Sequence, residues 1–303
     1  MANNEGISVN TVRKYLTSHK IEWDHSHVNL RGRNSATRYD ALKRIVEASA
    51  PKCRDPIRLH GNAIVTACWH SGALAIDPYW RVIKETAAAL GIHRLIGLGD
   101  LISSDYYRRR AQEEIGEAAK PEQEYSAMDA LLDYLKPDIK ELVWVPGNHE
   151  ALLLRILKMG IEPARLRGLL KVTGMRVTMA WQSYMFLDDW RLTHCRNYSV
   201  NRFAVERKLQ AKFPGQKIGH AHAHRLSVGY SDAGVPMIEI PAMADPERMG
   251  YIMRDDTTHP QHTPGFFVHW QGNMVPYAQG FTDKLWPVWL EAVRQQRIKE
   301  GRR

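Results

Sequence analysis

The chain has 303 residues, of which 44% are hydrophobic and 25% are charged. These values are ordinary for a globular protein and exclude a wholly disordered or fibrous chain. No stretch approaches the roughly 20 apolar residues that cross a bilayer, and the polar start lacks the apolar run of a secretory signal. We therefore expect no membrane contact and a place in the reducing cytoplasm.

The chain is basic, because 42 Lys and Arg residues stand against 33 Asp and Glu residues and give a formal net charge of +9. Such an excess favours an anionic partner such as nucleic acid, a nucleotide or a phosphorylated molecule. The three cysteines, Cys53, Cys68 and Cys195, are too few and too scattered to cross-link a domain of this size. We expect free thiols or metal ligands.

Two short basic helices are predicted near the start, at residues 9–18 and 38–48. They form either a docking appendage or a small helix-turn-helix module, and the absence of an obvious recognition helix favours the appendage. The predicted domains are a helical basic N-terminal appendage, a main domain, and a C-terminal helix with a basic tail. Their boundaries are 1–58, 59–283 and 284–303.

The first half of the main domain alternates apolar strands with helices. The clearest helix is 79–90, with Asp77 as its N-cap, Pro78 in its first turn and Gly91 just past its end. This alternation predicts a parallel sheet whose chemistry lies at the carboxyl ends of its strands. The predicted strands are 63–68, 94–99 and 141–146, and the further helices are 122–135 and 151–158.

After about residue 176 the pattern changes to short apolar or alternating runs separated by turn residues, which predicts a second, mixed sheet. These runs include RVTMAW, SYMFL, WRLTH, QKIGHAH, LSVGY, PMIEI and GFFVHW. The expected fold is α/β: two facing mixed β-sheets flanked by helices, a four-layer αββα sandwich, with the helical appendage at the N-terminus. An amphipathic helix at 284–294 is expected to run into a frayed tail.

Groups that bind metals follow several of the predicted strands. They are Cys68, His70, Asp100, Asn148, His149, Glu150, His194, His220 and His222. Carboxylate and amide oxygens suit hard divalent ions, whereas imidazole and thiolate suit borderline ones. One carboxylate, Asp100, could bridge two ions about 3.5 to 4 Å apart, as in two-metal hydrolases.

The order of these blocks resembles the calcineurin-like metallophosphoesterase superfamily, whose signature is DxH, GD, GNH followed by D or E, a lone His, and GHxH. The corresponding blocks here are CWH at 68–70, GD at 99–100, GNHE at 147–150, His194, and GHAH at 219–222. Four of the five blocks match, over about residues 63–280. The spacing and GFFVHW are most similar to the branch found in phages and prophages, for which the compartment would be the host cytoplasm.

The resemblance implies two divalent ions, of Mn, Zn or Fe. One would be held by Cys68, His70, Asp100 and His222, and the other by Asp100, Asn148, His194 and His220. His149 would act as the general acid or transition-state stabiliser beside the leaving oxygen, with Asp100 as the shared catalytic carboxylate.

Cys68 departs from the family pattern, which has aspartate there. A thiolate binds Zn or Fe well and Mg or Mn poorly, so a working first site would be softer than usual. The alternative is a weakened or empty first site.

Four further residues are predicted to contact the substrate: Arg108, Arg196, Tyr198 and His224. Guanidinium groups pair with phosphate, and aromatic rings stack on bases. His224 is placed on the same strand face as His222, where it could equally support the ligands. A solvated helix start is the alternative for the segment SSDYYRRR, which contains Arg108.

The leading hypothesis is a dinuclear-metal-dependent phosphodiesterase or nuclease that acts on nucleic acid or a nucleotide. The alternatives are a degenerate member that binds nucleic acid without catalysis, and a small-molecule phosphomonoesterase. A protein serine/threonine phosphatase is disfavoured, because that branch extends GD to GDxVDRG and this chain reads GDLISSD. The sequence indicates no oligomeric state.

Overall fold

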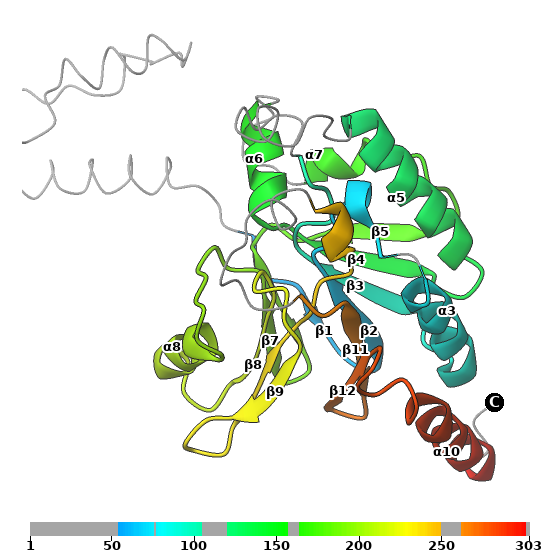
Figure 1. Ribbon diagram of the computed structural model, residues 1–303, viewed down its shortest axis with the longest axis vertical. Coiled ribbons are helices and arrows are strands. Elements are labelled where there is room, and N and C mark those ends of the chain that lie inside the picture. Colours follow the sequence, from blue (N-terminus) through cyan, green and yellow to red (C-terminus); the bar gives the residue numbers. More distant parts are fainter. Residues whose placement is uncertain (1–53, 76, 105–119, 157–163, 250–261, 301–303) are drawn as a thin grey trace, which may run out of the picture. The chain divides into compact units, whose positions relative to one another are not determined.

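The computed structural model describes residues 54–75, 77–104, 120–156, 164–249 and 262–300, which belong to one compact unit, Arg54–Arg303 (Figure 1). The helices predicted at 9–18 and 38–48, and Arg108, lie outside the described residues. None of the helices in the described ranges combines the length and the apolar character needed to cross a membrane.

The first sheet has six strands in the order β12-β11-β2-β3-β4-β5. Its strands are β2 (Ala63–Ala67), β3 (Arg94–Leu98), β4 (Glu141–Val145), β5 (Arg176–Met179), β11 (Gly265–Trp270) and β12 (Asn273–Ala278). β2 to β5 run parallel, whereas β11 is antiparallel to β2 and to β12. The chain between the parallel strands forms α3 (Tyr79–Leu90), α5 (Pro121–Leu135), α6 (Asn148–Ile156) and α7 (Ala164–Arg167), with a 3₁₀ turn η2 (Ser71–Ala73).

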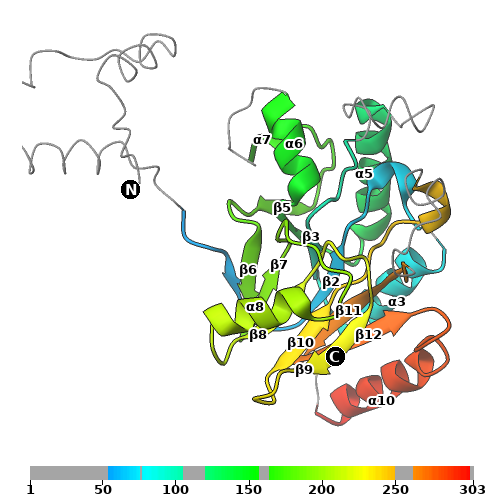
Figure 2. The ribbon, with the colours of Figure 1, turned by 60° about the vertical axis from the view of Figure 1, so that its left-hand side comes forward.

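The second sheet also has six strands, in the order β1-β6-β7-β8-β10-β9. They are β1 (Arg58–Leu59), β6 (Tyr184–Leu187), β7 (Trp190–Thr193), β8 (Lys217–His220), β9 (Ser227–Tyr230) and β10 (Pro236–Glu239). The remaining elements are α8 (Ala204–Lys212), η4 (Pro246–Arg248) and α10 (Trp286–Lys299). Figures 1 and 2 show α8 beside the second sheet, and α3 and α5 beside the first.

The layers follow from the two-residue period of the strands. On β2, Ile64 packs with the helices on the outer face, whereas Val65 points into the core between the sheets. Leu95 and Ile96 divide in the same way on β3. Because both faces are covered, these strands are apolar apart from Thr66 and Arg94. The predicted α/β fold of two mixed sheets flanked by helices is confirmed.

The assignment of every run after residue 176 to the second sheet is wrong. β5 is the edge strand of the first sheet, where Arg176 pairs with Glu141 of β4. β11 also belongs to the first sheet, where Phe267 pairs with Val65. The alternating pattern predicts that a segment is a strand, but it carries no information on the partner strand.

The predicted limits of α3 are confirmed, but its predicted N-cap is wrong. Pro78 occupies the cap position, and the Asp77 side chain is 84% exposed, with Oδ1 3.9 Å from Arg81 Nε. At the other end Gly91 has φ of 62°, and its N–H donates to the Ala87 carbonyl. α10 continues to Lys299, so the predicted frayed tail is helical for five residues beyond residue 294.

Candidate metal centre

The carboxyl ends of strands from both sheets deliver the predicted metal-binding side chains to one place. Cys68 follows β2, Asp100 follows β3, and His194 follows β7. Three groups of side chains there have their ligand atoms within 4.8 Å of one another. The groups are Cys68, His70 and His224; Cys68, Asp100 and His194; and His70, Asp100 and His149.

Asp100 lies at the middle of this cluster and is 1% exposed. Its Oδ2 is 3.1 Å from His194 Nε2, 3.8 Å from His222 Nδ1 and 3.9 Å from His149 Nε2. Burial alone would raise the pKa of the Asp100 carboxyl, but His194 and then His149 lower it well below its usual value. The carboxylate is therefore held charged, as a bridging ligand requires.

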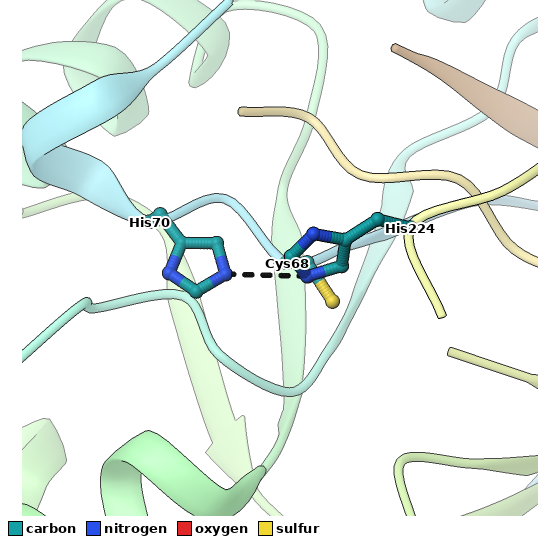
Figure 3. A group of neighbouring side chains, drawn as sticks. All are labelled: Cys68, His70 and His224. Atoms are coloured by element: carbon teal, nitrogen blue, oxygen red, sulfur yellow. Dashed lines mark hydrogen bonds between the residues drawn. The ribbon is translucent and has the colours of Figure 1, made fainter. Parts of the chain in front are cut away.

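Cys68, His70 and His224 form the second half of the cluster (Figure 3). His70 Nε2 is 3.4 Å from His224 Nε2, and Cys68 Sγ is 3.5 Å from His194 Nε2. Around a tetrahedral zinc ion, two nitrogen ligands lie about 3.3 Å apart, and a thiolate and a nitrogen lie about 3.6 Å apart. The separation between His70 and His224 therefore fits coordination of one ion by both rings.

Several atoms that could bind a metal ion are buried here without a hydrogen bond. Within the described part of the chain they include Asp100 Oδ2, His220 Nε2 and His222 Nδ1, and Asn148 Oδ1, next to His149 in sequence, is in the same state. An unsatisfied buried polar atom costs about 1–3 kcal/mol, so native proteins keep few of them. Oxygen and imidazole nitrogen are ligand atoms for divalent ions, and the residues present therefore fit a metal centre.

Backbone strain gathers at the same place. Five residues of the cluster have positive φ, in or near the left-handed region: Cys68 (48°), His70 (43°), Asp100 (52°), His222 (83°) and His224 (55°). This conformation costs a non-glycine residue of the order of 1–3 kcal/mol and persists where surrounding contacts fix it. Such a concentration of strained residues is typical of functional sites.

Glu150 holds the Asp100 loop in that strained shape. Its carboxylate accepts hydrogen bonds from the backbone N–H groups of Asp100 (2.9 Å), Leu101 (2.7 Å), Ile102 (3.4 Å) and Gly147 (2.8 Å). Burial, and then the neighbouring Asp100, raise the pKa of Glu150. The sequence places Glu150 in the GNHE block but does not assign this role, because the three partners in the Asp100 loop lie 48 to 50 residues away.

Gly99 and Gly147 are required by close packing. A Cβ atom on Gly147 would collide with the Asp100 carboxylate and backbone, and one on Gly99 would collide with the His194 ring. Gly99 also has φ of 71°. Only glycine lets the β3 and β4 ends approach each other this closely.

His149 lies in the first turn of α6, which begins at Asn148 rather than at the predicted residue 151. Its N–H donates to Asp100 Oδ1 at 2.9 Å, and its ring Nδ1 is hydrogen-bonded to the Ser103 carbonyl. Because a carbonyl only accepts, the Nδ1 atom carries a proton. The ring therefore presents Nε2 to the centre, 3.9 Å from Asp100 Oδ2.

His220 is a predicted ligand whose Nε2 atom is buried without a hydrogen bond among the described residues. It is the last residue of β8, and its Nδ1 is 3.1 Å from Glu206 Oε1 on α8. Burial lowers the pKa of His220, but its interactions with Cys195 and Glu206 outweigh burial and raise the pKa to about 9. None of the metal-binding groups found among the described residues contains it.

His224 lies beside His70, although it was predicted to contact the substrate. The prediction placed His222 and His224 on one strand face, which is wrong, because β8 ends at His220 and both residues have positive φ. Burial, and then His70 and His262, lower the pKa of His224 well below its usual value.

Two other predicted substrate residues lie on the loop after β7. Arg196 is exposed there, and Tyr198 is 41% exposed with its ring centroid 6.4 Å from that of His222. In the same segment Cys195, like Cys68, is a free thiol, as expected.

Comparison with known proteins gives similarity at the level of solved structures. No model of a protein family matches the chain, and neither does any curated protein. Vps29 from Chaetomium thermophilum is 12% identical, with 73% of this chain and 95% of that chain covered and a TM-score of 0.37. A nuclease MPE from Pseudomonas putida is 16% identical, with 71% and 87% covered and a TM-score of 0.29.

A conserved protein from Streptococcus pneumoniae TIGR4, described as a predicted phosphoesterase, is 10% identical, with 72% of this chain and 98% of that chain covered and a TM-score of 0.28. All three TM-scores lie below 0.5. The chemistry of the site therefore rests on the residues of this chain alone.

Proposed function

We propose that this chain is a metal-dependent phosphoric ester hydrolase of the calcineurin-like kind, with two divalent ions, that cleaves phosphodiesters of nucleic acid or nucleotides. The observation that carries the proposal is the approach of the His194 and His222 rings to Asp100, where Asp100 Oδ2 and His222 Nδ1 are buried without hydrogen bonds. A cluster of this composition is costly for a folded protein unless an ion completes it.

Two contacts favour ligand sets in which His222 and His224 take the places that the family signature gives to His220 and His222. The first ion is held by Cys68, His70, Asp100 and His224. The second ion is held by Asp100, Asn148, His194 and His222. The contact of His224 with His70 and the approach of His222 Nδ1 to Asp100 support this register. His220, bonded to Glu206, then supports the loop that carries His222.

The two ions, when bound, supply Lewis acidity to the phosphoryl oxygens and lower the pKa of a water molecule. The chain's own groups do the rest. Asp100, held by the His149 N–H and by the loop that Glu150 fixes, keeps the ligands in register. His149 keeps its Nδ1–H on the Ser103 carbonyl, so the doubly protonated form of the ring would carry a second proton on Nε2 and could give it to the leaving oxygen.

The substrate class is supported by charge and by one exposed ring. The net charge of +9 favours a polyanion. Tyr198 offers a ring face close to His222, where a base next to the scissile phosphate can stack. Arg196 is exposed on the same loop and can pair with a neighbouring phosphate.

The test is a steady-state assay of the purified chain with an aryl phosphodiester, an aryl phosphomonoester, and single-stranded DNA or RNA, each with Mn, Zn or Fe. We expect turnover of the diesters that disappears on chelation and returns on adding metal. The matched variants are Tyr198→Ala, expected to raise KM for the nucleic acid, and Tyr230→Ala, which removes another exposed tyrosine on β9.

A protein that binds metal but hydrolyses none of these esters would contradict the enzyme and favour the non-catalytic alternative. Turnover of the monoester alone would contradict the diester assignment.

A further inference from the structure

Three histidine rings lie in a row at the edge of the candidate metal centre. His70 Nε2 is 3.4 Å from His224 Nε2, as Figure 3 shows, and His224 Nδ1 is 3.1 Å from His262 Nδ1. The ring centroids are 5.2 Å and 4.6 Å apart, and the rings of each pair are steeply inclined. Both nitrogens of His224 therefore have another imidazole nitrogen as neighbour.

Each of these contacts is a hydrogen bond only if one proton lies between the two nitrogens. A neutral imidazole, the form that binds metals, carries a single N–H. If His224 carries it on Nε2, it donates to His70, and its Nδ1 accepts from His262. If His224 carries it on Nδ1, it donates to His262, and its Nε2 has a lone pair available.

Only the second arrangement lets His224 bind an ion through Nε2. The ring is 5% exposed, so a tautomer that left Nδ1–H without an acceptor would incur the cost of a buried unsatisfied donor. His262 removes that cost, because its Nδ1 can donate in one arrangement and accept in the other. The same contact thus serves both tautomers.

We infer that His262 is a positioning residue: by accepting the Nδ1–H of His224, it satisfies this buried donor in the tautomer whose Nε2 binds the first ion. This inference rests on the metal centre proposed above. Protons are conserved in the change. His224 loses a proton from Nε2 and gains one on Nδ1, while His262 loses one from Nδ1 and gains one on Nε2. His262 is only partly buried, so solvent can exchange these protons.

A carboxylate or carbonyl group usually orients a metal-binding histidine by accepting its N–H. Here the imidazole of His262 has that position. Removal of such a partner typically weakens metal binding by about 10–100-fold. The loss of affinity should affect the first ion, which His224 holds, and leave the affinity for the second ion unchanged.

The experiment is a titration of the metal-free full chain with Co²⁺. The charge-transfer absorption between the Cys68 thiolate and cobalt reports the first ion, and elemental analysis reports the total. His262→Ala should weaken the first ion by about 10–100-fold and leave the second unchanged. His262→Gln, whose amide oxygen can still accept, should bind the first ion nearly as the unaltered chain does.

The control is His93→Ala, which removes a histidine bonded to the Asp138 carbonyl on an exposed surface and should change neither ion. First-ion affinity in His262→Ala equal to that of the unaltered chain would overturn the inference alone. So would a His262→Gln variant that binds the first ion as weakly as His262→Ala does. An unaltered chain that takes up no cobalt would overturn the proposed function and this inference with it.

Discussion

The neighbouring strands β3 and β4 have one carboxylate at their amino ends, Glu141 of β4, and one just past their carboxyl ends, Asp100 after β3. The two carboxylates differ in whether protein groups satisfy their oxygens. At the amino ends, Glu141 accepts from Arg94 Nε and from Arg176 Nη2, both at 2.8 Å. At the carboxyl ends, Asp100 faces three imidazoles, and its Oδ2 has no hydrogen bond of normal geometry. Arginine side chains therefore satisfy the Glu141 carboxylate, whereas Asp100 Oδ2 is available to a ligand.

This difference separates stability from function along the same strands. Glu141, Arg94 and Arg176 are the first residues of neighbouring parallel strands, and their pairing aligns these strands. At the other end the chain accepts strained residues and unpaired buried atoms, which lower stability unless ions bind. Changes at the two ends should therefore be read out by different measurements.

The largest effect is expected for Asp100→Asn. The amide removes the charge that both ions share, so kcat/KM should fall on the order of 10³-fold or more, and metal content should fall with it. The measurement is steady-state kinetics with elemental analysis. Glu141→Gln is the matched control at the other end of the strands and should keep both turnover and metal. Equal losses of turnover and metal in the two variants would show that the two ends of these strands do not differ in function.

His149→Ala should lower kcat by about 10²–10⁴-fold, because it removes the proton donor to the leaving oxygen. Metal content should stay at two ions per chain, since His149 is not among the proposed ligands. Elemental analysis and kinetics on the same sample separate the two effects. A variant that loses metal along with activity would make His149 a ligand instead of an acid.

Cys68→Ala should weaken the first ion by about 10²-fold or more, because a direct ligand matters at least as much as its supporting residues. Cys68→Asp should move the metal preference from Zn or Fe toward Mn. Competition between these metals, followed by elemental analysis, measures both. Cys195→Ala is the matched control, and unchanged stoichiometry in Cys68→Ala would remove Cys68 from the ligand set.

Glu150→Gln should lower the free energy of unfolding by about 1–3 kcal/mol, because the new NH₂ group faces backbone N–H donors. Urea denaturation of the metal-free chain measures it. Glu85→Gln, which breaks an exposed pair with Arg81, should change it by less than about 1 kcal/mol. Similar values for the two variants would show that Glu150 does not support the loop.

The smallest effect concerns pH and His269, on β11 at the amino end of β2. Burial lowers its pKa, and its Nδ1 donates to the Gly61 carbonyl. The unfolded chain, with a pKa of about 6.5, takes up the proton first as the pH falls, so stability should drop below about pH 6.5. In His269→Gln, the free energy of unfolding should fall less steeply below about pH 6.5, as measured by denaturation at a series of pH values. The same dependence on pH in the variant and the unaltered chain would exclude His269 as its source.

The sequence predicts most of the fold because its signals are local. Gly91 marks the end of α3 correctly, and the two-residue period identifies the strands. Partnership between strands is not local, which is why the pattern alone places β5 and β11 in the wrong sheet. For the same reason the contacts of Glu150 with Leu101, 49 residues earlier, could not be predicted.

The sequence could predict which residues form the candidate site, but not which of them contact one another. GHAHAH contains three alternating histidines, and alternation predicts a common face only while the chain stays in a strand. β8 ends at His220, after which His222 and His224 adopt positive φ and turn to different neighbours. Only the folded backbone shows that His224 lies against His70.

The most direct test of the account is a crystal structure of the chain grown with Zn²⁺ or Mn²⁺ and measured at the absorption edge of the metal. We predict two anomalous peaks that share Asp100, with Cys68 Sγ and the Nε2 atoms of His70 and His224 around the first. Well-ordered density for these side chains with no anomalous peak in reach of Asp100 would contradict it.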